Sequence, residues 1–317
     1  MNISKELSKS EISTLLDRSD LKAAWEVVFT WGVIISVLVI AVIWTNLFTI
    51  FMAWILVGAR QLALAILMHD FAHYAMFKSK RANQIVGQWL SAYPIFLNME
   101  KYRTYHLRHH SHTGTDKDPD MPLVEMYPST SKSLARKFSR DLLGISGLKS
   151  YLGIILMNMG MLEYELGGSV KWITPKPTLS QSLKALAENL IGPLIVNGLI
   201  FLAFYFAGKP ILYLLWFIPM ITSTMFFLRI RSIAEHGVTP DRNDPMQNTR
   251  TTIAQWWQKL LFAPHNVHYH LEHHLLMTVP SYNRPAMHKL LNQKGLLDNA
   301  CVEQGYMQVL KKAVKSN

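Results

Sequence analysis

The amino-acid sequence predicts an all-α membrane protein, in which four transmembrane helices form two hairpins and a helical cytoplasmic cap holds a histidine-rich di-metal site. Three observations predict this fold. Four apolar stretches are long enough to cross a bilayer, very short turns join them in pairs, and groups of histidines at helical spacing follow the stretches. We expect a single domain over residues 1–317, in which membrane and cap segments alternate along the chain.

Each apolar stretch has the length of a membrane-spanning helix, since about 20 apolar residues cross a hydrocarbon core of about 30 Å. Prolines and glycines inside the last two stretches are compatible with spans, because neighbouring helices can satisfy the freed backbone groups. The alternative is a soluble protein with buried core helices, but core helices of this length rarely lack charge. The expected spans are residues 25–44, 47–68, 187–207 and 211–228, and the expected cap comprises residues 69–186 and 229–317.

Two segments outside the spans have features of their own. Residues 1–20 are polar and charged, which does not fit a signal peptide. Within them, the pattern Ser8-x-x-Glu11 predicts the capping box of a short amphipathic helix. Residues 145–162 are apolar but interrupted by glycine, lysine and asparagine. We expect this second segment to lie at the membrane interface or to re-enter the membrane partly.

The distribution of charge predicts the orientation. The chain has 32 Lys and Arg against 21 Asp and Glu, a net charge of +11. Between the paired spans the turns carry only Lys209, so the opposite, basic side should be cytoplasmic, with both termini and all histidine groups. Arg60 lies within a span, where we expect it to snorkel or to form a buried pair. The surplus of positive charge indicates anionic lipid as a partner, and no motif indicates nucleic acid.

Histidines at helical spacing are the strongest functional signal. The pattern His-x-x-His-His occurs twice, in YHLRHHSHT and YHLEHHLLM, and HDFAH adds a pair four residues apart. On a helix, spacings of three and four residues place side chains on one face. Imidazole is the commonest protein ligand for iron, copper and zinc. The candidate ligands are His69, His73, His106, His109, His110, His270, His273 and His274.

A ninth candidate, His236, follows the fourth expected span by eight residues, at the mouth of that span. Three acids adjacent to candidate ligands, Asp70, Glu235 and Glu272, are candidates to accept hydrogen bonds from the imidazoles. Adjacent side chains point to different sides of a helix, so we expect each acid to serve a histidine of another group. The remaining histidines are interpreted as structural or as outer partners of the site: His112, His265, His268 and His288.

The ligand chemistry indicates two metal ions. Zinc sites saturate at four ligands, so nine imidazoles exceed one ion, whereas two ions would keep open positions for dioxygen or substrate. The single cysteine, Cys301, excludes an intrachain disulfide, Cys-ligated zinc and a built-in iron–sulfur cluster. Neutral imidazoles without thiolates fit oxygen-activating iron better than zinc. Geometry alone does not name the metal, because the affinity order favours copper and zinc over iron.

The motifs HDFAH, HLRHH and HLEHH, together with their placement relative to the spans, resemble the histidine boxes of the membrane fatty acid desaturase superfamily. That group includes acyl desaturases, acyl and alkane hydroxylases and carotenoid ketolases. The resemblance extends from about Gln61 to Arg284. It implies a mainly helical four-span bundle with two non-haem iron ions, and it implies that the nine candidate histidines are the iron ligands. No His-Pro-Gly-Gly motif of a fused cytochrome b5 is present.

The resemblance implies a membrane oxidoreductase that uses dioxygen and two electrons to introduce a double bond into an acyl chain. The alternative is a hydroxylase or ketolase of an acyl, alkane or carotenoid chain, because both reactions start by abstracting one hydrogen. A metal-binding or metal-transport protein without catalysis is disfavoured, since transporters place ligands near the membrane midplane. The expected partners are an acyl substrate on an unspecified carrier, a lipid membrane and an external electron donor such as a ferredoxin or rubredoxin.

Overall fold

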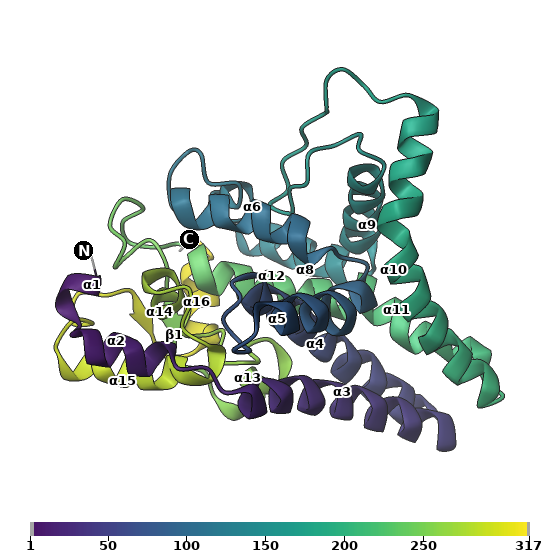
Figure 1. Ribbon diagram of the computed structural model, residues 1–317, viewed down its shortest axis with the longest axis horizontal. Helices are drawn as coiled ribbons and strands as arrows, with labels where there is room; N and C mark the ends of the chain where they lie inside the picture. Colours follow the sequence, from purple (N-terminus) through teal and green to yellow (C-terminus); the bar gives the residue numbers. More distant parts are fainter. Residues whose placement is uncertain (1–2, 316–317) are drawn as a thin grey trace.

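Long helices dominate the computed structural model, which describes residues 3–315 (Figure 1). Four segments are long and apolar enough to cross a membrane. Three of them are single helices, and the fourth is built from three consecutive pieces. They are α3 (Asp20–Ile43), α4 (Leu47–Ala72), α10 (Leu179–Phe206) and the segment Pro210–His236, which comprises η3 (Pro210–Tyr213), α11 (Leu214–Ile221) and α12 (Ser223–His236).

Helices α3 and α10 start before the spans expected from the sequence. The side chain of Ser19 accepts a hydrogen bond from the backbone N–H of Lys22, and Thr178 forms a capping box with Gln181. Such caps satisfy N–H groups that the first turn of a helix leaves without partners. Each helix therefore begins in polar sequence, ahead of its apolar residues.

The fourth expected span, residues 211–228, is not one helix. It breaks at Thr222, which has φ −120° and ψ −91° and separates α11 from α12. The break follows Pro219, which has no N–H to donate to the carbonyl of the preceding turn. Helix α12 then continues beyond the apolar residues to His236. The ninth candidate ligand is thus the last residue of this helix, not a residue of a separate loop.

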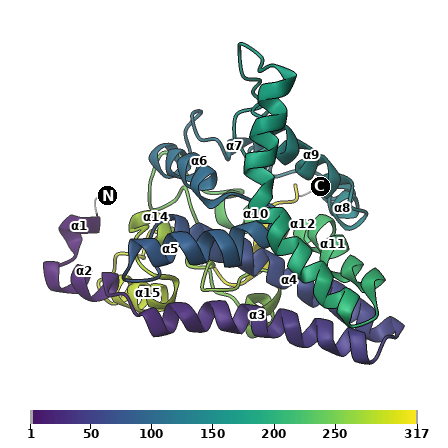
Figure 2. The same ribbon diagram turned by 45° about the vertical axis from the view of Figure 1, so that its right-hand side comes forward.

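The two turns between the long segments lie at the same end of the molecule. Helices α3 and α4 lie side by side (Figures 1 and 2), and Asn46 between them caps α4 with its side-chain oxygen. Lys209, in the turn after α10, donates hydrogen bonds to the carbonyl of Val42 (2.6 Å) and to the hydroxyl of Thr45 (2.8 Å). These contacts join the second turn to the first.

Helix α4 is the central helix of the bundle. In its apolar window 61% of the residues are buried, against 28% for α3 and 22% for α10. It packs against α3, α11, α12 and α6 (Met99–His112). At Gly58 the helices α4 and α12 approach so closely that a Cβ atom would lie 2.1 Å from Ser223 Oγ. The outward faces of α3 and α10 remain apolar and exposed, which is typical of a surface that lipid covers.

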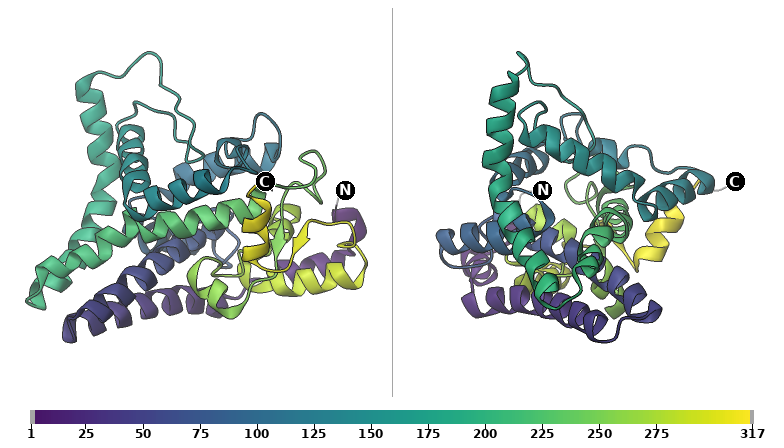
Figure 3. Two further views of the ribbon diagram at one scale, coloured as in Figure 1. Left: turned by 180° about the vertical axis from the view of Figure 1, so that it is seen from behind. Right: turned by 90° about the vertical axis from the view of Figure 1, so that its right-hand side faces the viewer.

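Most of the shorter helices lie away from the two turns, toward the other end of α4 (Figure 3). Two strands, β1 (Thr251–Thr252) and β2 (Val302–Glu303), pair in parallel there. The remaining elements are α1 (Ile3–Glu6), α2 (Lys9–Leu16), α5 (Lys80–Val86), the π-helix η1 (Gly87–Ala92), η2 (Tyr93–Ile95), α7 (Met121–Val124), α8 (Ser131–Leu142), α9 (Ile145–Asn158), α13 (Trp256–Leu261), α14 (His270–Leu275), η4 (Ser281–Asn283), α15 (Arg284–Gln293) and α16 (Tyr306–Lys312).

Two expectations about local features have clear outcomes. The capping box of Ser8 and Glu11 is present and begins α2, as predicted. Arg60 is only 2% exposed, so the expectation of snorkelling is wrong; among the described residues it pairs with no acid, and its guanidinium donates to the carbonyl of Leu260. The expected interfacial segment 145–162 contains the helix α9, which packs against α8, α10 and α11.

Candidate metal centre

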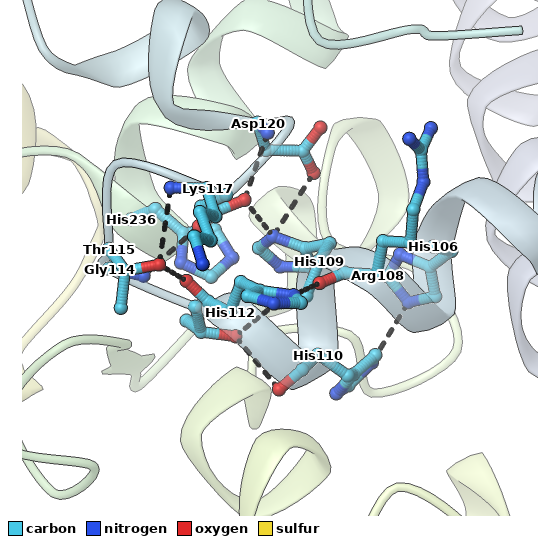
Figure 4. Close-up of polar contacts among 12 residues, drawn as sticks. His106, Arg108, His109, His110, His112, Gly114, Thr115, Lys117, Asp120 and His236 are labelled. Atoms are coloured by element: carbon cyan, nitrogen blue, oxygen red, sulfur yellow. Dashed lines mark hydrogen bonds and ion pairs between the residues drawn. The ribbon is translucent and has the colours of Figure 1, made fainter.

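Nine histidines meet where α4, α6, α12 and α14 converge. Helix α4 ends at its C-cap residue His73, and α12 ends at His236. Figure 4 shows the three candidate ligands of α6, which are His106, His109 and His110, together with His236. The remaining three come from α14. These nine are the residues that the sequence suggested as ligands: His69, His73, His106, His109, His110, His236, His270, His273 and His274.

The nine side chains form two adjoining groups. Within each group, every ring offers one nitrogen that lies within 4.8 Å of the nitrogens offered by the others. The rings of His110 and His274, one from each group, stack with their centroids 4.3 Å apart. The chain therefore presents two neighbouring donor sets made only of imidazole. The five-histidine group is His69, His73, His106, His110 and His273, and the four-histidine group is His109, His236, His270 and His274.

Each His-x-x-His-His pattern divides between the two groups. On α6 the outer histidines join the five-histidine group and His109 joins the other, whereas on α14 the outer histidines join the four-histidine group and His273 joins the first. Adjacent residues on a helix differ in direction by about 100°, because a turn contains 3.6 residues. The middle histidine of each pattern therefore points away from its neighbour and toward the second group.

Imidazole nitrogens within each group face one another at short range. Nε2 of His110 lies 3.0 Å from Nε2 of both His106 and His273. In the other group, Nε2 of His270 lies 2.8 Å from Nε2 of His236. Where both nitrogens carry lone pairs, such contacts are repulsive unless a cation lies among them. The donor sets therefore fit metal ions.

Hydrogen bonds at the opposite ring nitrogens support the same interpretation. Nδ1 of His69 lies 2.7 Å from an oxygen of Asp70, and Nδ1 of His109 lies 2.7 Å from an oxygen of Asp118. A neutral imidazole carries one proton, so a proton donated from Nδ1 leaves a lone pair on Nε2. The Nε2 atoms of His69 and His73 are buried and have no hydrogen-bond partner among residues 3–315. Carboxylates that orient ligating imidazoles in this way are common in metal sites.

Burial favours the neutral form of six of the candidate imidazoles. Removal from water disfavours the charged form and is the largest cause of the lowered pKa values; charge on neighbouring imidazoles lowers them further. A neutral imidazole keeps the lone pair that a metal ion needs, so the site is ready to bind metal near neutral pH. The pKa lies well below its ordinary value for His73, His106, His110, His270, His273 and His274.

The three acids named from the sequence have different roles. Asp70 accepts from its own neighbour His69 and from the buried Arg284, so the expectation that it serves another group is wrong. Glu235 lies 3.6 Å from Nδ1 of His270, a histidine of another motif. Among the described residues, Glu272 forms no side-chain hydrogen bond or ion pair with any of the nine histidines. It accepts hydrogen bonds from the hydroxyl of Thr251 and from His288 (2.5 Å).

Sequence reasoning missed several residues that contact the groups, among them Asp120, whose carboxylate lies 3.6 Å from Nδ1 of His109. Asp118 holds His109, and it also accepts from the backbone N–H of Gly114 (3.1 Å). The hydroxyl of Thr113 lies 3.2 Å from Nδ1 of His274, and Arg284 lies 3.3 Å from Nδ1 of His273. The run TGTDKDPD contained a signal for Asp118, because aspartate side chains bond nearby backbone N–H groups in turns. Nothing local to the sequence around Arg284 indicates its contacts.

The four remaining histidines lie outside both groups, in agreement with their interpretation as structural or outer residues. Nδ1 of His112 lies 3.0 Å from the backbone carbonyl of Arg108. His265 contacts the carboxylate of Glu26 at 3.2 Å. His268 is buried, and His288 is the partner of Glu272 described above.

A cavity of about 260 Å³ lies against the two groups. Its wall includes His106 from the five-histidine group and His109, His236 and His270 from the other. Helices α4, α6, α9 and α12 supply most of the remaining wall. The cavity provides space for a reacting molecule next to the imidazoles.

The histidine-rich centre and its surrounding helices correspond to a known family. Residues 44–300 match the sequence profile of the family described as fatty acid desaturase. The chain belongs to this family. The match covers three of the four apolar segments, all except α3, and all nine histidines.

Several curated desaturases are similar to this member of the fatty acid desaturase family. Dihydrorhizobitoxine desaturase of Bradyrhizobium elkanii is 25% identical over 72% of this chain and 64% of its own length. The sn-1 oleoyl-lipid 12-desaturase of Synechocystis sp. is 22% identical over 91% of this chain and 81% of its own. The sn-1 acyl-lipid omega-3 desaturase (ferredoxin) of Nostoc sp. is 24% identical over 73% of this chain and 64% of its own length. The chain thus spans less than two thirds of the first and third relatives.

The desaturase relatives indicate an oxidoreductase with a metal site that the histidine groups are able to form. Their names differ in substrate, from dihydrorhizobitoxine to acyl lipids. Family membership therefore supports the general reaction class and leaves the substrate to be argued from the site of this chain.

Proposed function

We propose that this protein is a membrane-bound desaturase that introduces a double bond into an acyl chain, using dioxygen, two electrons and two non-haem iron ions. The observation that carries the proposal is the pair of adjoining all-histidine groups, next to a cavity and at one end of four apolar helices, in a chain of the desaturase family. Oxygen insertion by the same centre, giving a hydroxylated or ketolated product, is the alternative.

The nine histidines of the two groups would hold the iron ions, five on one ion and four on the other. When bound, the ions supply the dioxygen-derived oxidant that removes hydrogen from an unactivated methylene. The chain's own contribution is placement. Asp70 and Asp118 fix two imidazoles through Nδ1, and the buried walls keep water from the reacting carbon.

The distribution of charge supports a membrane setting with the centre on the cytoplasmic side. Both turns between the paired helices lie at one end, and among their residues only Lys209 carries positive charge. The positive-inside rule then assigns the opposite end, with the histidine groups, to the cytoplasm. This orientation makes the centre accessible to soluble electron carriers.

Electrons would come from an external carrier. The chain has one cysteine and no fused cytochrome b5 motif, and one relative is named for its use of ferredoxin. A small acidic ferredoxin or rubredoxin would suit a chain with a net charge of +11. Turnover with dioxygen and substrate in the absence of any donor would contradict this part of the proposal.

The test is product analysis with purified, iron-loaded protein in lipid nanodiscs, reduced ferredoxin, dioxygen and a panel of acyl substrates. The panel comprises free acids, thioesters on coenzyme A or acyl carrier protein, and acyl lipids. We expect about two irons per chain and a product that has lost two hydrogens. A product that gains one oxygen atom instead establishes the hydroxylase alternative. Bound zinc without iron after growth in ample iron, with no product from any substrate, overturns the proposal.

A further inference from the structure

The cavity beside the histidine groups has a polar wall that a plain hydrocarbon chain does not need. Besides imidazoles, it is lined by three acids and two arginines, and the arginines both come from α12. Three serines add further polar groups. The charged residues are Asp120, Asp141, Arg229, Arg231 and Glu235, and the serines are Ser146, Ser150 and Ser232.

Most of these charged groups already have partners within the protein. Arg229 holds Asp141 with two hydrogen bonds, from Nε (2.5 Å) and from a terminal nitrogen (2.8 Å). The carboxylate of Asp120 accepts a hydrogen bond from the hydroxyl of Tyr105. These groups form hydrogen bonds with one another, so a molecule that enters the cavity does not need to supply hydrogen-bond partners for them.

Arg231 is the exception. Its Nε donates to Glu235 at 2.6 Å, but neither of its terminal nitrogens donates a hydrogen bond to any residue within 3–315. The side chain is 12% exposed and lines the cavity, and these two nitrogens are not among the fully enclosed atoms that lack partners. The terminal nitrogens of Arg231 are thus available to a molecule in the cavity.

The available donors of Arg231 lie close to the candidate metal centre. Arg231 contacts Glu235, and the same oxygen of Glu235 lies 3.6 Å from Nδ1 of His270 in the four-histidine group. Arg231 therefore lies on the Nδ1 side of His270, with one carboxylate oxygen between them, and both residues line the same cavity. The cavity volume of about 260 Å³ corresponds to roughly nine water-sized groups. The cavity that Arg231 shares with the histidines therefore holds only a short segment of a substrate.

A hydrocarbon that filled this cavity would displace water from the terminal nitrogens of Arg231, and it has no atom that can accept a hydrogen bond from them. Leaving a charged donor without a partner in a dry site costs several-fold to a hundred-fold in affinity. Sites that contain such polar groups strongly disfavour molecules that lack the matching acceptor. The cavity is therefore built for an acceptor close to the reacting carbon.

We infer that Arg231 binds a carbonyl or carboxylate oxygen of the substrate, so that oxidation occurs within a few bonds of that polar group. This inference rests on the proposed desaturase function and narrows its substrate class. It favours a short or polar-headed molecule, or an acyl chain oxidised near its carboxyl end, over a long chain oxidised near its middle. Arg231 would set specificity, and the histidines would remain the site of chemistry.

Ligand binding tests the inference without turnover. Iron-loaded protein in nanodiscs, kept anaerobic and without electron donor, is titrated with octanoate, octanamide and octane, and binding is followed by thermal stabilisation. We expect octanoate and octanamide to bind at least about tenfold more tightly than octane, the factor typical of a hydrogen bond to a charged donor. Equal affinities in the native protein overturn the inference, whatever happens to any variant.

Two variants at Arg231 separate substrate binding from a structural role. Arg231→Met should reduce the preference for octanoate over octane to about onefold, by weakening octanoate binding and strengthening octane binding, while iron content stays unchanged. Arg231→Lys should restore part of the preference. Arg140→Met removes the same charge from an exposed position of α8 and should leave the preference intact. A loss of iron, or an equal loss of affinity for all three ligands, would show that Arg231 acts only through Glu235 and would overturn the inference.

The outcomes also distinguish the inference from the proposed function. Protein that prefers octanoate but oxidises no substrate contradicts the proposed function and leaves the binding role of Arg231 intact. Protein that desaturates acyl chains far from the carboxyl group, without any preference among the three probes, contradicts only the inference.

Discussion

The ring of His109 has a partner at one nitrogen and an available lone pair at the other. Its Nδ1 lies 2.7 Å from Asp118, whose own oxygens also accept backbone N–H groups of Gly114 and Asp120. The turn after α6 is thereby folded around the carboxylate. The residue that orients the imidazole is held by the chain on both sides, so the lone pair at Nε2 has a defined direction.

Replacing His110 should remove most of the bound metal. The Nε2 atom of His110 contacts those of His106 and His273, so its loss opens the five-histidine group. The matched control is His112→Ala on the same helix, because His112 bonds only a backbone carbonyl and lies outside both groups. We expect metal analysis to show a clear loss in His110→Ala and none in His112→Ala. The reverse result would contradict the ligand assignment.

Replacing Asp118 should weaken metal binding without removing a ligand. Asp118→Asn takes away the charge that holds Nδ1 of His109, and loss of such a partner typically costs about 10- to 100-fold in metal affinity. Competition with a chelator of known affinity measures the change. Asp116→Asn alters an exposed carboxylate two residues away and should have no effect. Equal affinities in the two variants would exclude a role for Asp118 at the centre.

The metal-free protein should lose stability in acid. Burial lowers the pKa of His106, His270 and His274, so the folded chain stays neutral at these positions while the unfolded chain, with a pKa of about 6.5, binds protons. The free energy of unfolding should therefore fall as the pH drops below about 6.5, by up to about 1.4 kcal/mol per pH unit for each such histidine. Denaturation with chelator present, from about pH 8 to pH 5, measures this slope. A free energy of unfolding that does not change with pH over this range would contradict the prediction.

Helix contacts, rather than loops, set the relative positions of the two histidine groups. Helix α4 carries His69 to one group and α12 carries His236 to the other, and the two helices touch at Gly58 and Ser223. Trp54 and Thr224 add hydrogen bonds across the same contact. A change in spacing between these helices is therefore transmitted to the centre.

Adding a methyl group at Gly58 should destabilise the protein and disturb metal binding. In Gly58→Ala the new Cβ would lie 2.1 Å from Ser223 Oγ and 3.1 Å from the backbone nitrogen of Thr224, so α12 must shift. Gly32→Ala in α3 is the control, because nothing lies within 4 Å of its Cβ and alanine favours a helix by about 1 kcal/mol over glycine. The melting temperature in thermal denaturation and the metal content should both fall in Gly58→Ala, and neither should fall in Gly32→Ala. Equal behaviour of the two variants would contradict the close helix contact.

At the scale of the whole molecule, the two turns and the histidine centre lie toward opposite ends of the long helices. Lys209 ties one turn to the other, and α4 runs from that end to His69 and His73. Figure 3 shows the shorter helices gathered away from the turns. If the long helices cross a membrane, the turns and the centre face different compartments.

Cysteine labelling tests this topology. On a Cys301→Ser background, single cysteines at Thr45 or Ala207 should react with an impermeant reagent applied to intact cells, because both positions are exposed at the turns. Cysteines at Lys9 or Lys315, also exposed, should react only after the cells are opened. Labelling of Lys9 and Lys315 positions from outside would invert the proposed orientation. Labelling of only one of them would require an odd number of spans.

The sequence by itself determined the four apolar segments and the identity of the nine clustered histidines. Both depend on patterns within one helix: about 20 apolar residues for a span, and spacings of three and four for a helix face. The desaturase family was also recognisable from the three motifs, and the profile match confirms it. Local patterns suffice for these features because each is a property of neighbouring residues.

Only the tertiary structure decided which histidines of different helices come together and what orients them. The partition of His109 and His273 into opposite groups depends on how α6 and α14 face each other across α4 and α12. The contacts of Arg284 with Asp70 and of Glu235 with His270 join residues far apart in the chain. Such pairings arise from packing between helices, and a single sequence carries no period or spacing that encodes them.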